Sequence, residues 1–149
     1  MQIIRNKEIL EKECKLVYLK EGLTITRKLL SVCLFGKNKD CVGLAHNQVG
    51  GNKRVFVAKI NNQWTTFINP QIVSTSEDYI MHSESCMSFP NKFNKVKRFN
   101  KITLEHQVRA RNSNNGNAFI TEEFEGIDSF IIQHEIDHLN GVHIFNKGE

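Results

Sequence analysis

The sequence contains little proline, tryptophan or tyrosine and no long apolar run. Its 149 residues include 2 Pro, 1 Trp and 2 Tyr against 10 Phe, which predicts a core built largely on phenylalanine. No stretch of about 18 apolar residues occurs, which argues against a membrane span. Charged residues interrupt segment 1–15, so it does not have the pattern of a secretory signal. We therefore expect a cytoplasmic protein with no membrane partner.

The sequence has 4 cysteines but no C-x-x-C pair. Their irregular spacing predicts neither a zinc ribbon nor a disulfide framework. We expect a reducing compartment, in which one of these thiols is functional. The four are Cys14, Cys33, Cys41 and Cys86.

The formal net charge is +4, and the basic residues are scattered with one exception. That exception is NKFNKVKRFNK at 91–101, which we interpret as a solvated strand face. The charge permits a weak contact with a ribosome but predicts no specific nucleic-acid partner.

The length and composition are those of one soluble globular domain, so 1–149 is predicted to be a single domain. Apolar residues at helical spacing predict a helix over 24–34, with Gly36 ending it. Segments 54–60 and 64–74 are rich in β-branched and aromatic residues and predict short strands, broken by Asn61, Asn62 and Pro70. Segments 101–110 and 118–124 predict a hairpin around a polar turn at 111–117.

A last helix is predicted over 126–139, with Gly141 placed to end it. Ile127 and Ile131 would share the face of His134 and His138, and the opposite face is also apolar, so the helix belongs in the interior. The opposite face would consist of Ile132, Ile136 and Leu139. The predicted fold class is α+β, with short, largely antiparallel strands packed around this buried C-terminal helix.

The segment QHEIDHLNG at 133–141 contains an H-E-x-x-H motif. On a helix, a separation of four residues places His134 and His138 about 40° apart on one face, where they can share a metal ion. Glu135 lies beside that face, where it can act as a general base on a metal-bound water. An H-x-x-x-H pair also arises by chance, so the motif alone leaves the function open.

A catalytic metal site usually takes three protein ligands, so another His, Cys, Asp or Glu is expected. Cys86, in HSESCMSFP, is a candidate because an irregular backbone between Ser and Pro can turn a thiolate inward. A set of two His and one Cys accepts zinc, cobalt, nickel or ferrous iron. The alternative is that Cys86 is simply a small buried apolar residue.

Three motifs, in the same order and at similar spacings, resemble those of peptide deformylases. CVGLAHNQVG resembles the family's G-x-G-x-A-A-x-Q, ESCMS resembles E-G-C-L-S, and QHEIDHLNG resembles Q-H-E-x-D-H-L-x-G. The third match is more specific than a bare H-E-x-x-H, because Gln133, Asp137, Leu139 and Gly141 match as well. The resemblance covers the chain from about Thr24 to Phe145.

This resemblance implies a metallohydrolase that removes the N-formyl group from the N-terminal methionine of newly made polypeptides and releases formate. It implies one divalent metal ion, with ferrous iron as the native metal and nickel, cobalt or zinc as replacements. The implied metal ligands are Cys86, His134 and His138. The implied catalytic groups are Glu135 as general base and acid, and the Gln48 amide and Met87 backbone N–H as donors to the oxyanion.

The resemblance also implies roles around the reacting centre. Val42, Gly43, Phe130 and Ile131 would shape a methionine pocket, although Phe130 and Ile131 fit a plain helix-core role equally well. Glu84 is expected to support loop geometry. Gln133 and Asp137 are expected to orient the metal-bound histidines, with an ordinary surface hydrogen bond as the alternative. The remaining histidines are expected on the surface or in loops: His46, His82, His106 and His143.

The sequence departs from the family pattern at Cys41, His46 and Ser85, each of which replaces a glycine or alanine. We expect these side chains to lie close to the substrate path. Phe93 stands where bacterial members often carry an arginine that contacts the substrate backbone. The chain ends 8 residues after Gly141, which resembles compact phage-encoded members and predicts a phage or unusual bacterial origin.

Two other functions stay open from the sequence. A metallopeptidase would also carry H-E-x-x-H, but such enzymes usually take their third ligand from Glu or His farther downstream. A non-catalytic binding protein derived from the same fold would explain the departures at positions 41, 46 and 85. Against it, every residue with an implied chemical role is present.

Overall fold

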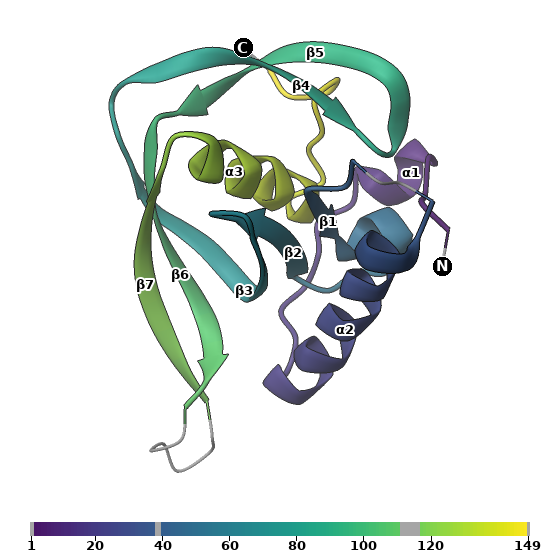
Figure 1. Ribbon diagram of the computed structural model, residues 1–149, viewed down its shortest axis with the longest axis vertical. Coiled ribbons are helices and arrows are strands. Elements are labelled where there is room, and N and C mark those ends of the chain that lie inside the picture. Colours follow the sequence, from purple (N-terminus) through teal and green to yellow (C-terminus); the bar gives the residue numbers. More distant parts are fainter. Residues whose placement is uncertain (1, 38–39, 111–116, 149) are drawn as a thin grey trace.

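The computed structural model describes all residues except 1, 38–39, 111–116 and 149 (Figure 1). Its strands form a five-stranded sheet of order β1-β2-β3-β6-β7 and a two-stranded sheet of β4 and β5, and every pairing between described strands is antiparallel. The strands are β1 (Gly43–Ala45), β2 (Val55–Ile60), β3 (Gln63–Thr75), β4 (Tyr79–Cys86), β5 (Phe89–Phe99), β6 (Lys101–Arg109) and β7 (Asn117–Glu125). The predicted α+β class with antiparallel strands is confirmed.

Two long helices cover opposite faces of the larger sheet. The helices are α1 (Lys7–Leu10), α2 (Leu19–Phe35), the 3₁₀ helix η1 (His46–Val49) and α3 (Ile127–Leu139). In Figure 1, α3 lies between the two sheets, where it contacts β1, β2, β5 and β7, and α2 contacts β1, β2 and β3 from the other side. Among the described residues, no helix is long and apolar enough to cross a membrane.

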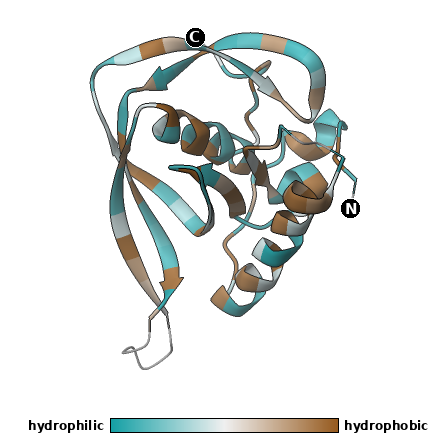
Figure 2. Ribbon diagram, in the orientation of Figure 1, coloured by the Kyte–Doolittle hydropathy of each residue, from teal (hydrophilic) through white to brown (hydrophobic). Residues whose placement is uncertain are grey.

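Strand β2 joins the two halves of the core because its side chains alternate between faces. Phe56 and Ala58 belong to the apolar cluster around α3, whereas Val55 and Val57 belong to the cluster around α2. All four are fully buried. Strand β2 is mostly hydrophobic along its length, whereas β5 is largely hydrophilic (Figure 2). A strand covered on both faces loses the polar alternation that marks a half-exposed strand.

The helix predicted over 24–34 and the strand predicted over 64–74 differ from the observed elements. Helix α2 begins at Leu19, five residues earlier than expected, and ends at Phe35, with Gly36 after it as predicted. Strand β3 continues through Pro70, which was expected to break it, because a register shift between Ile68 and Gln71 accommodates the missing N–H at a bulge. The predicted hairpin is confirmed as β6 and β7, and its turn at 111–117 lies largely outside the described residues.

Helix α3 is bounded by two glycines with left-handed backbone. Gly126 (φ +65°) is its N-cap residue, and Gly141 (φ +74°) follows its last turn, where the Val142 N–H donates to the Asp137 carbonyl at 2.8 Å. A Cβ on Gly141 would lie 2.6 Å from the Glu11 carbonyl oxygen, so the close approach of the N-terminal segment also requires glycine at position 141.

The expected burial of Ile127 is wrong: its side chain is 58% exposed, because Ile127 is the first residue of the helix.

Candidate metal centre and pocket

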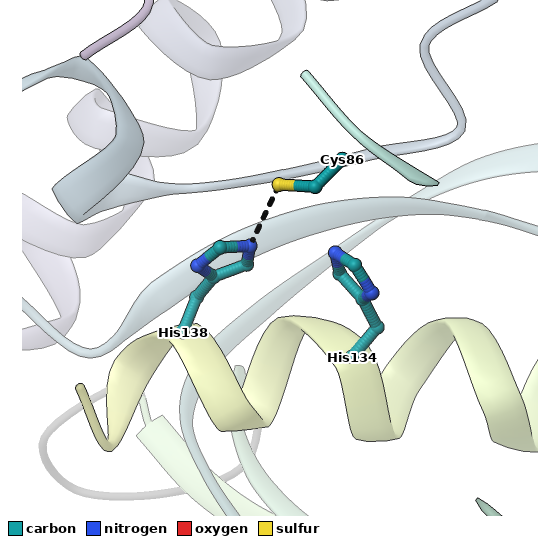
Figure 3. A group of neighbouring side chains, drawn as sticks. All are labelled: Cys86, His134 and His138. Carbon is teal, nitrogen blue, oxygen red and sulfur yellow. Dashed lines mark hydrogen bonds between the residues drawn. The ribbon is translucent and has the colours of Figure 1, made fainter. Parts of the chain in front are cut away.

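Cys86, His134 and His138 converge at one point (Figure 3). Their candidate ligand atoms all lie within 4.8 Å of one another. Both histidines point from the same face of α3, one turn apart, while Cys86 is the last residue of β4. A register shift between Ser85 and Cys86 breaks the β4–β5 ladder here, and the Cys86 Sγ lies 3.3 Å from the His138 Nε2. The three residues can therefore serve as one set of ligands.

His134 is held by a carboxylate from the neighbouring strand. Its Nδ1 lies 2.8 Å from the Glu84 Oε1, so Nε2 is the ring nitrogen that faces Cys86 and the centre of the cluster. Burial lowers the pKa of His134, but hydrogen bonds to Cys86 and Glu84 outweigh burial and raise this pKa to about 10. The surroundings of His134 therefore stabilise a positive charge, which suits a site for a cation.

His138 is fully buried and is neutral. Burial, followed by the positive charge of His134, lowers its pKa well below the ordinary value. A neutral imidazole is the form that binds a metal ion. Within the described part of the chain, its Nδ1 has no hydrogen-bond partner.

A buried arginine fixes Glu84 in turn. Arg98 of β5 is 1% exposed and donates to both Glu84 oxygens, each at 2.8 Å, and to Asp137 Oδ2 at 2.6 Å. Burial raises the pKa of Glu84, but hydrogen bonds from Arg98 and His134 lower it much further, so Glu84 is ionised. The prediction that segment 91–101 is a solvated face is therefore wrong for Arg98, whose buried guanidinium pairs with Glu84 and Asp137.

Asp137 and Gln133, which were expected to orient the two histidines, have other hydrogen-bond partners. Asp137 binds Arg98 and Lys147, and Gln133 binds the backbone of Phe99 together with Ser129, so neither holds His134 or His138. Glu84, expected only to support loop geometry, is the carboxylate that orients His134. The signal for this role was weak, because Glu84 and His134 are 50 positions apart.

Glu135 is buried beside the cluster and lacks a full set of partners. Burial, the largest cause, raises its pKa to about 7. Its Oε1 has no hydrogen-bond partner among the described residues, so this oxygen is available to accept a hydrogen bond from a ligand. A Cβ on Gly43 would lie 2.5 Å from the Glu135 Oε2, so glycine is needed where β1 passes this carboxylate.

The Gln48 amide is oriented toward the same centre. Gln48 is 2% exposed, and its Oε1 accepts from the Ala45 N–H at 3.0 Å. This bond fixes which end of the amide faces the site, because Nε2 then lies 3.4 Å from the Cys86 Sγ and 3.2 Å from the Ser88 Oγ. An N–H donor therefore faces the cluster.

A pocket of about 680 Å³ opens over these residues. Its lining includes all but one of the residues expected to act in binding or catalysis: Gln48, Cys86, Met87, His134 and Glu135, with Val42, Gly43, Phe130 and Ile131 around them. His138, the exception, lies beneath and is fully buried.

Three of the four departures from the family pattern lie at this pocket. Cys41, Ser85 and Phe93 are part of its lining, and Phe93 is 70% exposed. The expectation is wrong for His46, whose ring lies against Gly51 and accepts from the Lys53 N–H at 3.1 Å. His46 is absent from the residues that line the pocket.

The remaining histidines divide between surface and interior. His82 is partly exposed and lines the pocket, with its ring 4.8 Å from that of Phe130. His106 and His143 are 4% and 3% exposed. The expectation of a surface or loop position is wrong for His106, which is buried on β6, whereas His143 lies in the loop that follows α3. Both pack against phenylalanine rings, with Phe67 beside His106 and Phe89 beside His143.

The fold and the site together define a class of protein: a small α+β protein with a Cys-His-His candidate metal site on a buried H-E-x-x-H helix, beneath an open pocket. The donor set fits a divalent cation, because one histidine is neutral, the other sits where positive charge is stabilised, and the adjacent Glu135 Oε1 has no partner among the described residues. Comparison with known proteins identifies one family within this class.

The chain belongs to the polypeptide deformylase family, whose model matches residues 2–149. It is 38% identical over 109 residues to a peptide deformylase of Thermotoga neapolitana, and the match covers 72% of this chain and 62% of that protein. The fold superimposes on the crystal structure of the Thermotoga maritima peptide deformylase with a TM-score of 0.83, at 31% identity over 100% of this chain and 97% of that one. It also superimposes on PDF from the Vibrio parahaemolyticus bacteriophage VP16T in complex with actinonin, with a TM-score of 0.80, at 31% identity over 97% of this chain and 100% of that one.

Proposed function

We propose that this protein hydrolyses the N-formyl group from the N-terminal methionine of newly made polypeptides. The observation that carries this proposal is the convergence of Cys86, His134 and His138 beneath a pocket whose floor also holds Glu135 and the Gln48 amide. Family membership and the name of the Thermotoga neapolitana relative support the same reaction. Because the match spans 62% of that relative, the activity of the relative is extended to this chain as a proposal.

Cys86, His134 and His138 would hold one divalent cation. A thiolate with two imidazoles is a borderline-soft set, and we propose ferrous iron as the native metal, with nickel, cobalt or zinc as replacements. When bound, such an ion supplies Lewis acidity and makes water a nucleophile near neutral pH.

Glu135 would carry the proton in this reaction. A general base works best with a pKa near the working pH, and burial raises the pKa of Glu135 to about 7. The carboxylate would take a proton from the attacking water and deliver it to the departing amine. Formate and a free N-terminus would result.

Gln48 and Met87 would stabilise the charge that develops on the formyl oxygen. The Gln48 Nε2 faces the cluster from a fixed amide, and Met87 lines the pocket next to Cys86 in the chain. Loss of one such donor typically costs about 2.7–4 kcal/mol of barrier.

The pocket would take the methionine side chain. Val42, Gly43, Phe130 and Ile131 line it, and Phe130 and Ile131 belong to a helix fixed by the core. The proposed partner is the formyl-Met end of a nascent polypeptide in the cytoplasm, with at most a weak ribosome contact and no specific nucleic acid. The phage origin stays a prediction.

The test is formate release from a formyl-Met peptide by protein purified anaerobically with iron or nickel. We expect release from this peptide, none from an acetyl-capped peptide and none by Cys86→Ala. Because PDF of bacteriophage VP16T was crystallised in complex with actinonin, inhibition by actinonin gives a second readout.

Two outcomes of this test would favour the other functions. Cleavage of an internal peptide bond without formate release would favour a metallopeptidase. No turnover from folded, metal-loaded protein would favour a non-catalytic binding protein.

A further inference from the structure

Cys33 and Cys41 meet in the interior, 8 positions apart in the sequence. Cys33 lies near the end of α2, and Cys41 lies two residues before β1. Their Sγ atoms are 2.7 Å apart and the residues are 9% and 7% exposed. Both are free thiols, and the bond length of a disulfide is about 2.05 Å, so a small approach of the two sulfurs would join them.

The pair connects to the pocket through Cys41. Cys41 is part of the pocket lining, whereas Cys33 is not among the residues that line it. The Cys41 Sγ also lies 3.5 Å from the Gly43 carbonyl oxygen. Gly43 packs so closely against Glu135 that a Cβ at this position would clash with the carboxylate. A disulfide that restrains Cys41 would therefore also restrain the backbone next to this carboxylate.

The two thiols differ in acidity. They share one hydrogen bond, in which either sulfur can be the donor. The thiol that accepts this bond has its pKa lowered, and the thiol that donates it has its pKa raised. The thiolate is the reactive form of cysteine. Because Cys41 lines the pocket and Cys33 does not, Cys41 is the sulfur that attacks a peroxide in the pocket and Cys33 is the one that resolves.

We propose that Cys33 and Cys41 are a redox modification site, in which a hydroperoxide converts the two thiols into a reversible disulfide that restricts the pocket wall. The Cys41 thiolate attacks hydrogen peroxide, which forms a sulfenic acid and releases hydroxide. The Cys33 thiol then attacks the Cys41 sulfur, which forms the S–S bond and releases water. The sum is two thiols and one peroxide to one disulfide and two waters, and a dithiol reductant reverses it.

The first test is peptide mapping of nickel-loaded protein treated with stoichiometric hydrogen peroxide. We expect a Cys33–Cys41 crosslink that dithiothreitol removes, and slower backbone hydrogen exchange over residues 41–45 in the crosslinked protein. Cys33→Ser and Cys33→Ala should abolish both effects, and the matched variant Cys14→Ser, at another buried cysteine, should retain them. Oxidation of Cys41 to the sulfinate without a crosslink in the wild type would overturn the proposal.

The effect on turnover rests on the proposed function and is measured separately. Displacements of about 1 Å near reacting groups cost up to about 10²-fold in rate, so we expect kcat/KM for a formyl-Met peptide to fall about tenfold on crosslinking and to recover on reduction. A crosslink that changes neither hydrogen exchange nor kcat/KM would overturn the link to the pocket. If the reduced protein has no deformylase activity, the proposed function fails, while mapping and hydrogen exchange still decide the redox site.

Discussion

Glu135 differs from Glu84 because, among the described residues, no ion pair holds its carboxylate. Arg98 binds Glu84 and Asp137, so its charge is already shared between two other carboxylates. Glu135 is 4% exposed and has an unpartnered Oε1 within the described part of the molecule. Burial without a partner keeps its pKa near neutrality, which is the property a proton carrier needs.

Replacing Glu135 with glutamine should separate metal binding from turnover. Glu135→Gln keeps the shape and leaves Cys86, His134 and His138 unchanged, so we expect one metal ion per chain to remain. Formate release should fall by about 10²- to 10⁴-fold, the range typical for loss of a general acid–base group. The measurements are metal content by mass spectrometry and kcat with a formyl-Met peptide. Activity close to wild type would remove Glu135 from the proposed mechanism.

The β4–β5 hairpin and α3 are joined by one buried network of charges. Arg98 on β5 links Glu84 on β4 to Asp137 on α3, and Glu84 then reaches His134. The two elements that supply Cys86 and the histidines are thereby held in register. The geometry of the metal centre depends on this network as well as on the apolar core.

Arg98→Met should destabilise the protein, because it leaves the Glu84 carboxylate buried without its partner. Breaking a buried ion pair typically costs about 3–5 kcal/mol. We expect a free energy of unfolding lower by about this amount, measured by urea unfolding. We also expect weaker metal retention, measured by metal titration. The matched change Lys95→Met, at an exposed position on the same strand, should leave both quantities near wild type. Equal effects of the two changes would show that the network does not hold the hairpin.

The N- and C-terminal segments contact each other. The Gly141 backbone lies against Glu11, and the His143 Nε2 lies 3.4 Å from the Glu11 Oε2. His143 also accepts the Phe145 N–H at Nδ1 and packs beside Phe89. Because Phe89 shares an apolar cluster with Cys86, these segments support the β4–β5 end of the site.

The pH dependence of stability should report on His143. Burial, only partly offset by Glu11, lowers its pKa in the folded state below the ordinary 6.5. The unfolded chain therefore binds more protons below pH 6.5, and stability should fall as the pH drops below this value. His143→Gln should make the decline between about pH 6.5 and pH 5 shallower, measured by urea unfolding at each pH. An unchanged slope would show that His143 does not contribute to this decline.

Local patterns in the sequence predicted much of the fold and the candidate site. The helix carrying His134 and His138 follows from apolar periodicity and two flanking glycines, and the β6–β7 hairpin follows from two β-rich segments around a polar turn. The three short motifs indicated which residues converge, and the structure brings Cys86, His134, Glu135 and Gln48 to one pocket. The helix and the strands were predictable because neighbours along the chain specify them, whereas the convergence was predictable from the resemblance of the three motifs to those of a known family.

What the sequence by itself determined is therefore the set of reactive groups and the elements that carry them. Only the tertiary structure decided which carboxylate orients His134, why Arg98 is buried, where the His46 ring turns and that Cys33 meets Cys41. The physical reason is that these outcomes depend on how elements pack. The Arg98–Glu84 and Glu84–His134 contacts span 14 and 50 positions, so their partners become neighbours only when the sheets close around α3.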